Sequence, residues 1–481
     1  MYPTQKTCAL PGLILLALAS SLRADSQPAM FRGNPQHTGV YDAGAMFPAQ
    51  KERWRFQTAH VNRSTPAIVE GVVYAGSYDG NLYAIDAATG TLKWKFQTAG
   101  EITSSPAVAE GLVYVNNDAG LYALDARTGE QRWLLKTGAP VPFAHRWDYF
   151  QSSPAWVRGA LYFGSADGYL YAAEGKTGKV LWKFQTAGRV RASPAVADGV
   201  VYGGSMDGNL YALDAATGKL KWKFKTAGNA FFPFGEIQST PTVAEGAVYF
   251  GSRDGNLYAV DIATGQKKWA FSHNGSWCIS GPAVADGLVF AGSSDGQFVN
   301  AVDAQTGAEK WGFKMPSRVF SSGAIVAGDV YFGAWGGEVF WFDAKTGKQK
   351  GGAMAEAAVQ TSPVVADGVL YFGSDDGYLY AVELQAAKEH HAIKLDPQTY
   401  DIYAGEYELG GGQLMTLTRE GDKLLAQIPG QPKVELLAES PTHFFINEVP
   451  AEFEFVKDEK GSVVRLVLRQ SGMEFDARKI K

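Results

Sequence analysis

Cysteine is almost absent from this chain of 481 residues, since only Cys8 and Cys278 occur. Cys8 lies before the N-terminal apolar run rather than after it, so it cannot be a lipid-modified residue at the end of an export signal. Once such a signal is removed, Cys278 stands alone and no internal disulfide can form. We therefore expect Cys278, beside Trp277, to be a buried small apolar side chain rather than a reactive thiol.

Neither charge sign dominates, because 44 Lys and Arg stand against 49 Asp and Glu, spread along the chain. This balance excludes the basic footprint of a nucleic-acid-binding protein. The apolar run Leu10 to Leu18 is too short to span a bilayer. Preceded by Lys6, it is typical of an export signal over residues 1–24; the alternative is a buried N-terminal helix. Three cleavage points remain open, after Ala19, Ser21 or Ala24. The sequence thus predicts a periplasmic or secreted protein with no transmembrane segment after signal removal.

Glycine and aromatic residues are abundant, with 56 glycines and 13% Phe, Trp and Tyr. This composition favours a turn-rich all-β protein, because glycine supplies the positive φ of tight turns. A unit close to S-S-P-A-V-A-D-G-x-V-Y-x-G-S-x-D-G-x-L-Y-A-x-D-A-x-T-G-x-x-x-W recurs about every 42 residues. Its acidic residue after L-Y-A-x stands at Asp86, Asp125, Glu174, Asp214, Asp261, Asp303, Asp343 and Glu383. Four strand-like stretches per unit at this period predict an eight-bladed β-propeller.

The aspartates of the repeat are expected to cap turns, because aspartate before glycine accepts hydrogen bonds from the following backbone. Eight copies cannot all form one catalytic or metal site. A tryptophan recurs once per unit and suits packing between blades; it stands at Trp94, Trp133, Trp182, Trp222, Trp269 and Trp311. The seventh unit has Gly351 there, which marks its junction with the next blade as the weakest.

The eighth unit ends after Glu383 without its fourth strand. A matching strand stands at the other end of the array, around Trp54, before the first Pro-Ala. We therefore expect the Trp54 strand to complete the last blade and close the ring, which removes exposed strand edges.

Residues 30–384 resemble the family of propellers built from pyrroloquinoline-quinone-type repeats, on the repeated A-x-D-A-x-T-G-x-x-x-W. The lead-in Phe31-Arg32-Gly33-Asn34-Pro35-Gln36-His37-Thr38-Gly39 also resembles such proteins. The resemblance implies two functions. One is a non-enzymatic scaffold like the BamB-type factors of outer-membrane protein assembly, with no cofactor and an envelope protein or peptide as partner. The other is a quinone-dependent dehydrogenase that oxidises an alcohol or a sugar with pyrroloquinoline quinone and calcium.

The sequence favours the scaffold. Many of the dehydrogenases carry a vicinal disulfide on the cofactor, which a single cysteine cannot form. No cluster of Glu, Asn and Asp outside the repeated turns suggests a calcium site. In the BamB-type factor, an arginine in one loop and acidic residues in the next dock on the partner, and Arg191 and Glu236 occupy loosely comparable loops here. Gln238 stands where an acid is expected, and the lipid-bearing cysteine is missing.

Three connections between blades depart from the repeat and are rich in aromatic and charged residues: Pro140 to Phe150, Asn229 to Glu236, and His273 to Ser280. Such residues on loops are typical of a binding surface; the alternative is that the loops fold over each other and plug the channel. The residue before each S-S-P is expected at the channel rim, which gives Arg63, Thr103, Gln151, Arg191, Gln238, Ile279, Phe320 and Gln360. Several guanidinium groups at a polar rim suit a carboxylate or an acidic peptide. The candidate binding face comprises Arg63, Phe143, His145, Arg146, Trp147, Asp148, Arg189, Arg191, Phe231, Phe232, Phe234, Glu236, Trp277 and Arg318.

A second domain is expected after a linker over residues 385–399. Residues 400–481 alternate between apolar and polar side chains in eight short stretches, which predicts a small β-barrel. Segments such as Tyr403-Ala404-Gly405-Glu406-Tyr407 and Phe453-Glu454-Phe455 resemble the lipocalin-like domain behind β-lactamase-related serine hydrolases. That resemblance implies a role in homo-oligomerisation rather than chemistry. A barrel of this size is expected to be filled with side chains.

Overall fold

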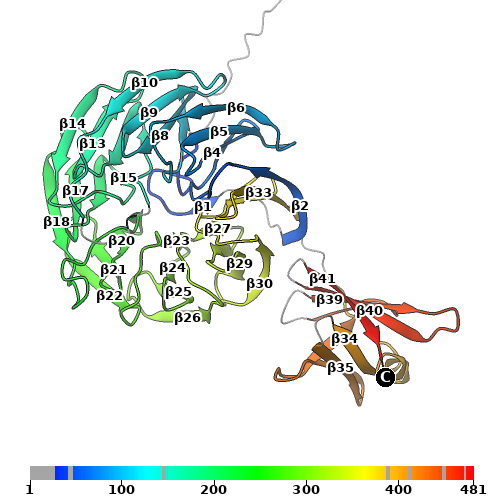
Figure 1. Ribbon diagram of the computed structural model, residues 1–481. Helices are drawn as coiled ribbons and strands as arrows, with labels where there is room; N and C mark the ends of the chain where they lie inside the picture. Colours follow the sequence, from blue (N-terminus) through cyan, green and yellow to red (C-terminus); the bar gives the residue numbers. More distant parts are fainter. Residues whose placement is uncertain are drawn as a thin grey trace, which may run out of the picture.

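The computed structural model describes residues 28–41, 47–143, 148, 150–385, 390–409, 413–446, 451–470 and 473–480. The predicted export signal lies outside these residues. Within them, the chain forms an eight-bladed β-propeller and an eight-stranded closed β-barrel, so the predicted fold class is confirmed. Figure 1 shows the blades arranged as a ring. No helix among the described residues is long and apolar enough to cross a membrane.

Each of blades 1 to 6 is an antiparallel sheet whose four strands follow the chain from the channel outward. Blade 1 comprises β3 (Ala67–Val69), β4 (Val72–Gly76), β5 (Asn81–Asp86) and β6 (Leu92–Gln97). Blade 2 comprises β7 (Ala107–Ala109), β8 (Leu112–Asn117), β9 (Gly120–Asp125) and β10 (Gln131–Lys136). Blade 3 comprises β11 (Ala155–Val157), β12 (Ala160–Gly164), β13 (Tyr169–Glu174) and β14 (Val180–Gln185). Blade 4 comprises β15 (Ala195–Ala197), β16 (Val200–Gly204), β17 (Asn209–Asp214) and β18 (Leu220–Lys225). Blade 5 comprises β19 (Thr242–Ala244), β20 (Ala247–Gly251), β21 (Asn256–Asp261) and β22 (Lys267–Ser272). Blade 6 comprises β23 (Ala283–Ala285), β24 (Leu288–Ser293), β25 (Phe298–Asp303) and β26 (Glu309–Lys314).

The last two blades close the ring. Blade 7 comprises β27 (Ala324–Val326), β28 (Asp329–Gly333), β29 (Glu338–Asp343) and β30 (Gln349–Met354), to which β1 (Val40–Tyr41) adds in parallel. Blade 8 comprises β31 (Val364–Ala366), β32 (Val369–Gly373), β33 (Tyr378–Gln385) and, as its outer strand, β2 (Phe47–Gln57). Trp54 of β2 lies opposite Ala381 of β33, so the N-terminal strand completes the eighth blade.

The turns of the repeat are built as their residue types predict. At Glu70-Gly71 both residues have positive φ, 48° and 73°, which is the conformation of a two-residue type I′ hairpin turn. Asp79 accepts hydrogen bonds from Asn81 N (2.8 Å) and from the Tyr83 hydroxyl (2.5 Å). Asp86 accepts from Thr89 N (3.1 Å) and from the Thr89 hydroxyl (3.0 Å). The prediction that these aspartates cap turns is confirmed.

Tryptophans connect neighbouring blades at seven of the eight junctions. Trp94 of blade 1 donates to Ala126 O of blade 2 (3.0 Å), and its ring covers Gly129. A Cβ at Gly129 would lie 2.7 Å from Trp94 Cδ2, so the glycine of the T-G turn also makes room for the ring. The same bond is formed by Trp54, Trp133, Trp182, Trp222, Trp269 and Trp311.

Blade 7 has no tryptophan on its outer strand, but it has one on the neighbouring strand β29, directly opposite the expected position. Trp341 on β29 lies opposite Gly351, is 1% exposed, and stacks on Tyr331 at 5.7 Å. In blade 1 the same pair is Ala84 opposite Trp94, so the large and the small residue have exchanged strands. Gly351 therefore leaves no hole. The junction with blade 8 nevertheless lacks the usual bond, because Trp341 Nε1 and the Tyr331 hydroxyl have no hydrogen-bond partner among the described residues.

The C-terminal barrel comprises the 3-10 helix η1 (Pro397–Ile402) and eight strands: β34 (Gly405–Leu409), β35 (Gln413–Glu420), β36 (Lys423–Gln427), β37 (Val434–Ala438), β38 (His443–Phe445), β39 (Ala451–Lys457), β40 (Val463–Gln470) and β41 (Met473–Lys479). Pairing of β34 with β41 closes the barrel. Its interior holds an apolar cluster of buried side chains that includes Tyr403, Tyr407, Phe444 and Phe455. This packing is what the short alternating stretches predict for a barrel of this size.

Candidate functional site

The channel mouth is built from two stacked rings of eight residues, one of each kind per blade. The upper ring consists of the predicted rim residues Arg63, Thr103, Gln151, Arg191, Gln238, Ile279, Phe320 and Gln360, and all eight line a common cavity. The lower ring lies two residues further along each chain segment: Thr65, Ser105, Ser153, Ser193, Thr240, Gly281, Ser322 and Ser362. Phe31 and Phe150 complete the lining, and the cavity volume is about 50 Å³. This is room for water rather than for a large ligand.

Hydroxyl groups of the lower ring connect neighbouring blades. Ser105 N donates to Ser153 Oγ (2.9 Å), and Ser153 N donates to Ser193 Oγ (2.9 Å). Across the closing junction, Ser362 N donates to Thr65 Oγ1 (2.9 Å). The serines and threonines of S-S-P therefore satisfy backbone groups that face the channel, which accounts for their recurrence.

Arg63 at the upper ring is paired with a carboxylate of the neighbouring blade. Its Nε and Nη2 each donate to Asp375 at 2.8 Å, and Gln360 Nε2 donates to the same carboxylate at 2.8 Å. The bidentate geometry holds the guanidinium firmly. The sequence suggested that Arg63 could bind an acidic ligand. In the structure its charge is already paired with Asp375.

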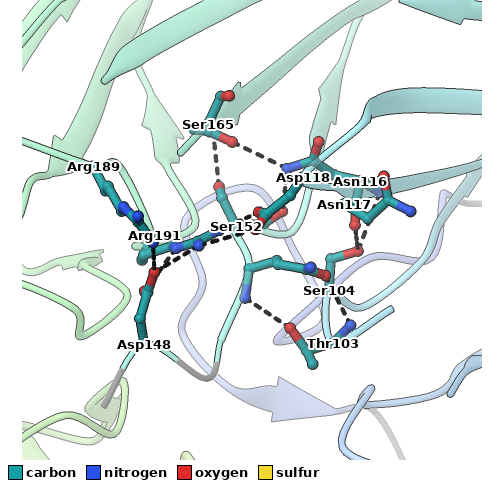
Figure 2. A network of polar contacts seen from close by, with 12 residues as sticks. Thr103, Ser104, Asn116, Asn117, Asp118, Asp148, Ser152, Ser165, Arg189 and Arg191 are labelled. Atoms are coloured by element: carbon teal, nitrogen blue, oxygen red, sulfur yellow. Dashed lines mark hydrogen bonds and ion pairs between the residues drawn. The ribbon is translucent and has the colours of Figure 1, made fainter. Parts of the chain in front are cut away.

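Arg191 and Arg189 are likewise engaged, and Figure 2 shows their network. Arg191 is 5% exposed; it donates to Asp148 from Nε (2.7 Å) and Nη2 (2.6 Å), and to Asp118 from Nη1 (2.6 Å). Arg189 donates from Nη1 to Oδ2 of Asp148, the same oxygen that accepts from Arg191 Nη2. Burial alone would raise the pKa of Asp148, but the hydrogen bonds from Arg191 and Arg189 outweigh it and hold the pKa below its usual value. The network ties Asp148 to the turn before blade 4.

Aromatic residues of the three irregular loops converge on an arginine that sequence reasoning missed. Arg253 is 1% exposed, and its guanidinium carbon lies 5.1 Å from the Trp277 ring, 5.7 Å from Phe143 and 5.9 Å from Phe232. Burial lowers the pKa of Arg253. The loops thus pack over one another here, as the plugging alternative expects. Arg253 occupies the variable position of S-x-D-G, and it is the one arginine among the eight copies, which was the available signal.

Other predicted residues divide between buried and exposed positions. Glu236 is buried at 2% exposure and so does not present its carboxylate to a partner. Phe231 and Phe234, in contrast, are 83% and 62% exposed. Arg318 is exposed and pairs with Asp295 at 2.9 Å. His145, Arg146 and Trp147 lie outside the described residues.

The exposed phenylalanine pair, Phe231 and Phe234, stands on an anchored loop. Asn229 Oδ1 accepts from Phe231 N (2.9 Å) and Phe232 N (2.7 Å), while Lys225 Nζ donates to Phe234 O (2.8 Å). Phe232, between them, packs edge-on against Trp277 at 4.9 Å. The loop therefore holds two large apolar side chains in water on a rigid base.

The described mouth residues do not fit a quinone with a calcium ion. A cavity of about 50 Å³ is far smaller than the roughly 300 Å³ or more of cofactor pockets. The nearby carboxylates of Asp118, Asp148 and Asp375 are each bound by an arginine, so they are not available as calcium ligands. No group of three or more His, Cys, Asp or Glu that could hold a metal occurs in the part of the chain that the structure describes. Cys278 is fully buried, as predicted, and burial raises the pKa of its thiol.

Two family profiles match the sequence. The family described as outer membrane protein assembly factor BamB matches residues 44–183 and 144–272, and a domain of unknown function (DUF3471) matches residues 389–481. The penicillin-binding protein 4* of Bacillus subtilis (strain 168) is 33% identical over 99 residues, which is 21% of either chain. The chain thus spans about a fifth of the length of that curated relative. The propeller carries BamB-like repeats, followed by a separate C-terminal domain, and part of the chain has a relative among penicillin-binding proteins; the resemblance found in the sequence is confirmed to this extent.

Solved structures share the propeller fold. BamB from Moraxella catarrhalis is 21% identical with a TM-score of 0.57, covering 71% of this chain and 99% of its own. Quinohemoprotein alcohol dehydrogenase from Comamonas testosteroni is 15% identical with a TM-score of 0.63, covering 80% of this chain and 85% of its own. The computationally designed Ika8 protein is 19% identical with a TM-score of 0.58, covering 70% of this chain and all of its own. An assembly factor, an oxidoreductase and a designed protein have this fold in common, so the likeness shows the fold alone.

Proposed function

We propose that this chain is an exported, non-enzymatic scaffold that binds a protein of the cell envelope and serves outer-membrane protein assembly. The observation that carries the proposal is the exposed phenylalanine pair on its anchored loop at the channel mouth. Large aromatic side chains dominate the binding energy of protein interfaces, and a rigid loop loses little entropy when it binds. The paired arginines and the small cavity at the mouth suit a surface for a protein better than a pocket for a small molecule.

The sequence left open whether the irregular loops form a binding surface or fold over one another at the channel, and the proposal assigns different loop residues to each role. Phe143, Phe232 and Trp277 pack around Arg253 and give the mouth a fixed shape. Phe231 and Phe234 project from this base into solvent. The packed residues support the loop, and the exposed ones supply contact area.

We expect the double substitution Phe231→Ser and Phe234→Ser to weaken partner binding at least about tenfold, because each aromatic anchor contributes about 1–2 kcal/mol or more. The measurement is affinity capture from envelope extracts with the full chain as bait, quantified by mass spectrometry. Leu181→Ser is the matched control, since Leu181 is 52% exposed but lies on outer strand β14. Capture that is unchanged in the double variant, or reduced equally by Leu181→Ser, would contradict the proposed contact face.

The alternative, a quinone-dependent dehydrogenase, has a direct test. Addition of pyrroloquinoline quinone and Ca²⁺ is expected to give no stoichiometric coloured complex and no dye-linked oxidation of alcohols or sugars. The reason is the cavity of about 50 Å³ and the arginine-bound carboxylates described above. A saturable absorbance change at one equivalent of quinone, lost on chelation of calcium, would replace the scaffold proposal by the enzyme.

A further inference from the structure

Residues 29–41, here called the N-terminal strap, lie across the centre of the propeller (dark blue in Figure 1). Carbonyl oxygens of the strap accept hydrogen bonds from the inner strands of five blades. The donors and acceptors are Val108 N to Ala29 O (2.8 Å), Val196 N to Pro35 O (2.7 Å), Val243 N to Gln36 O (2.9 Å), Val284 N to Thr38 O (3.0 Å) and Ile325 N to Gly39 O (2.7 Å). Each donor is the second residue of an inner strand, and each inner strand follows the lower ring, so the strap lies beneath the mouth cavity. Phe31 of the strap forms part of the cavity lining.

We propose that the channel beneath the mouth is a binding site for an extended peptide, that the chain fills this site with its own strap, and that this occupancy holds the ring closed. The ligand class is a peptide that offers backbone carbonyls in succession and one arginine. This role is separate from partner binding at the exposed phenylalanine pair.

Arg32 is the anchor of the strap. It is 1% exposed and donates from Nε to His37 O (2.8 Å), from Nη1 to Gly281 O (2.7 Å) and from Nη2 to Pro282 O. Among the described residues no carboxylate lies within ion-pair distance of it. A buried charge is stable only when its donors are satisfied, and the planar guanidinium satisfies three carbonyls at once. A lysine could not reproduce this fork.

One departure from the repeat, at Gly281, makes room for the strap. The lower ring has serine or threonine in seven blades but Gly281 in blade 6, where a Cβ would lie 2.8 Å from Arg32 Nη1. On the strap itself, a Cβ at Gly39 would lie 2.7 Å from the carbonyl oxygen of Gly323 in blade 7. Gly39 itself has φ of 75°. The channel wall is therefore shaped for this segment where the two approach most closely.

The strap also bears on ring closure. It ends as β1, which pairs with β27 of blade 7, and the chain then returns as β2, the outer strand of blade 8. The junction between blades 7 and 8 is the one where Trp341 Nε1 makes no bond among the described residues. At this junction the N-terminal segment therefore pairs with both blades, through β1 on blade 7 and β2 on blade 8. The other junctions have the hydrogen bond from a tryptophan.

The test uses the full-length chain with a protease recognition sequence in place of residues 42–46. After cleavage of the folded protein, the strap is expected to remain bound through gel filtration and to exchange slowly with a labelled synthetic peptide of residues 28–41. Arg32→Ala is expected to release it about 100-fold faster, since the two hydrogen bonds from this charged donor to Gly281 O and Pro282 O of blade 6 are lost. Val40→Ala is the control on the same segment, because Val40 is 40% exposed.

A second measurement on the uncut chain guards against unfolding after cleavage. In Arg32→Ala, and in Gly281→Ser, hydrogen exchange is expected to accelerate together at Val108, Val196, Val243, Val284 and Ile325. The Gly281→Ser change is informative because it restores the repeat consensus, which ordinarily stabilises a protein. Equal release of the strap by wild type and Arg32→Ala, or unchanged protection of the five amides in both variants, would overturn the proposal. The Phe231→Ser, Phe234→Ser variant should leave strap retention unchanged, so failure of one proposal does not imply failure of the other.

Discussion

Replacing Asp148 by asparagine is expected to lower the free energy of unfolding of the propeller by about 3 kcal/mol at pH 7. Asp148 lies between Arg189 and Arg191 and is the carboxylate common to both. When Asp148 loses its charge, Arg189 has no other ion pair among the described residues. Arg191 then has Asp118 as its one remaining ion-pair partner among those residues. Two guanidinium groups then repel each other in a partly buried site, which is the costly way to break a buried ion pair. All 12 tryptophans precede residue 385, so tryptophan fluorescence during denaturant unfolding reports on the propeller alone.

The same substitution carries a pH dependence whose sign follows from the pKa shift. The pKa of Asp148 is depressed in the folded state, so its contribution to stability is present above the unfolded-state value of about 3.9. That contribution is lost as the pH falls through the lower folded-state pKa. The difference in stability between wild type and Asp148→Asn should therefore be full near pH 7 and shrink below about pH 4.

Asp295→Asn is the matched control for Asp148→Asn. It breaks a rim pair with Arg318 in which both side chains are about half exposed, 59% and 47%. Exposed pairs contribute about 0–1 kcal/mol, so a small and weakly pH-dependent loss is expected. Equal losses in the two variants would show that the Asp148 network stabilises the propeller no more than an exposed ion pair does.

Much of the propeller could be predicted because the repeat encodes it locally. Strand alternation, Asp-Gly turns and one tryptophan per unit each act over a few residues, and eight copies reinforce one another. The upper ring was predictable for the same reason, since Arg63, Arg191 and Gln360 stand at one repeat position. The barrel strands followed from alternation alone, since the eight short alternating stretches predicted for residues 400–481 correspond to a closed barrel of eight strands.

The pairing of side chains at the mouth could not be predicted in this way. Asp375 is 312 residues from Arg63 in the sequence, and Asp118 is 73 residues from Arg191. Nothing in a single sequence indicates which rim charges meet, so the arginines looked available for an acidic ligand. The strap was missed because, apart from the bonds of Arg32, it is held by its own backbone carbonyls, which leave no pattern of side-chain types. Gly281 was the one sign of the strap in the repeat, and its role becomes clear only when the Arg32 side chain that it accommodates is seen.

The exchange of Trp341 and Gly351 between neighbouring strands predicts a strongly non-additive pair of substitutions. Trp341→Ala removes a ring that is 1% exposed and should cost about 3–5 kcal/mol. Gly351→Ala should cost about 1–3 kcal/mol by overpacking, because its Cβ would lie 2.0 Å from Trp341 Cζ2.

The double substitution Trp341→Ala and Gly351→Trp rebuilds the arrangement of Ala84 opposite Trp94 that blade 1 has. The large ring then returns to the outer strand, and the small residue gives it room on β29. We expect this variant to be more stable than the sum of Trp341→Ala and Gly351→Trp measured singly, by about 2 kcal/mol of interaction energy. The measurement is a double-mutant cycle followed by denaturant unfolding with the remaining tryptophans as reporters. Additive losses would mean that the two positions do not share one packing space. A gain over wild type would mean that a tryptophan on the outer strand can also make the bond to blade 8 that Trp341 Nε1 does not.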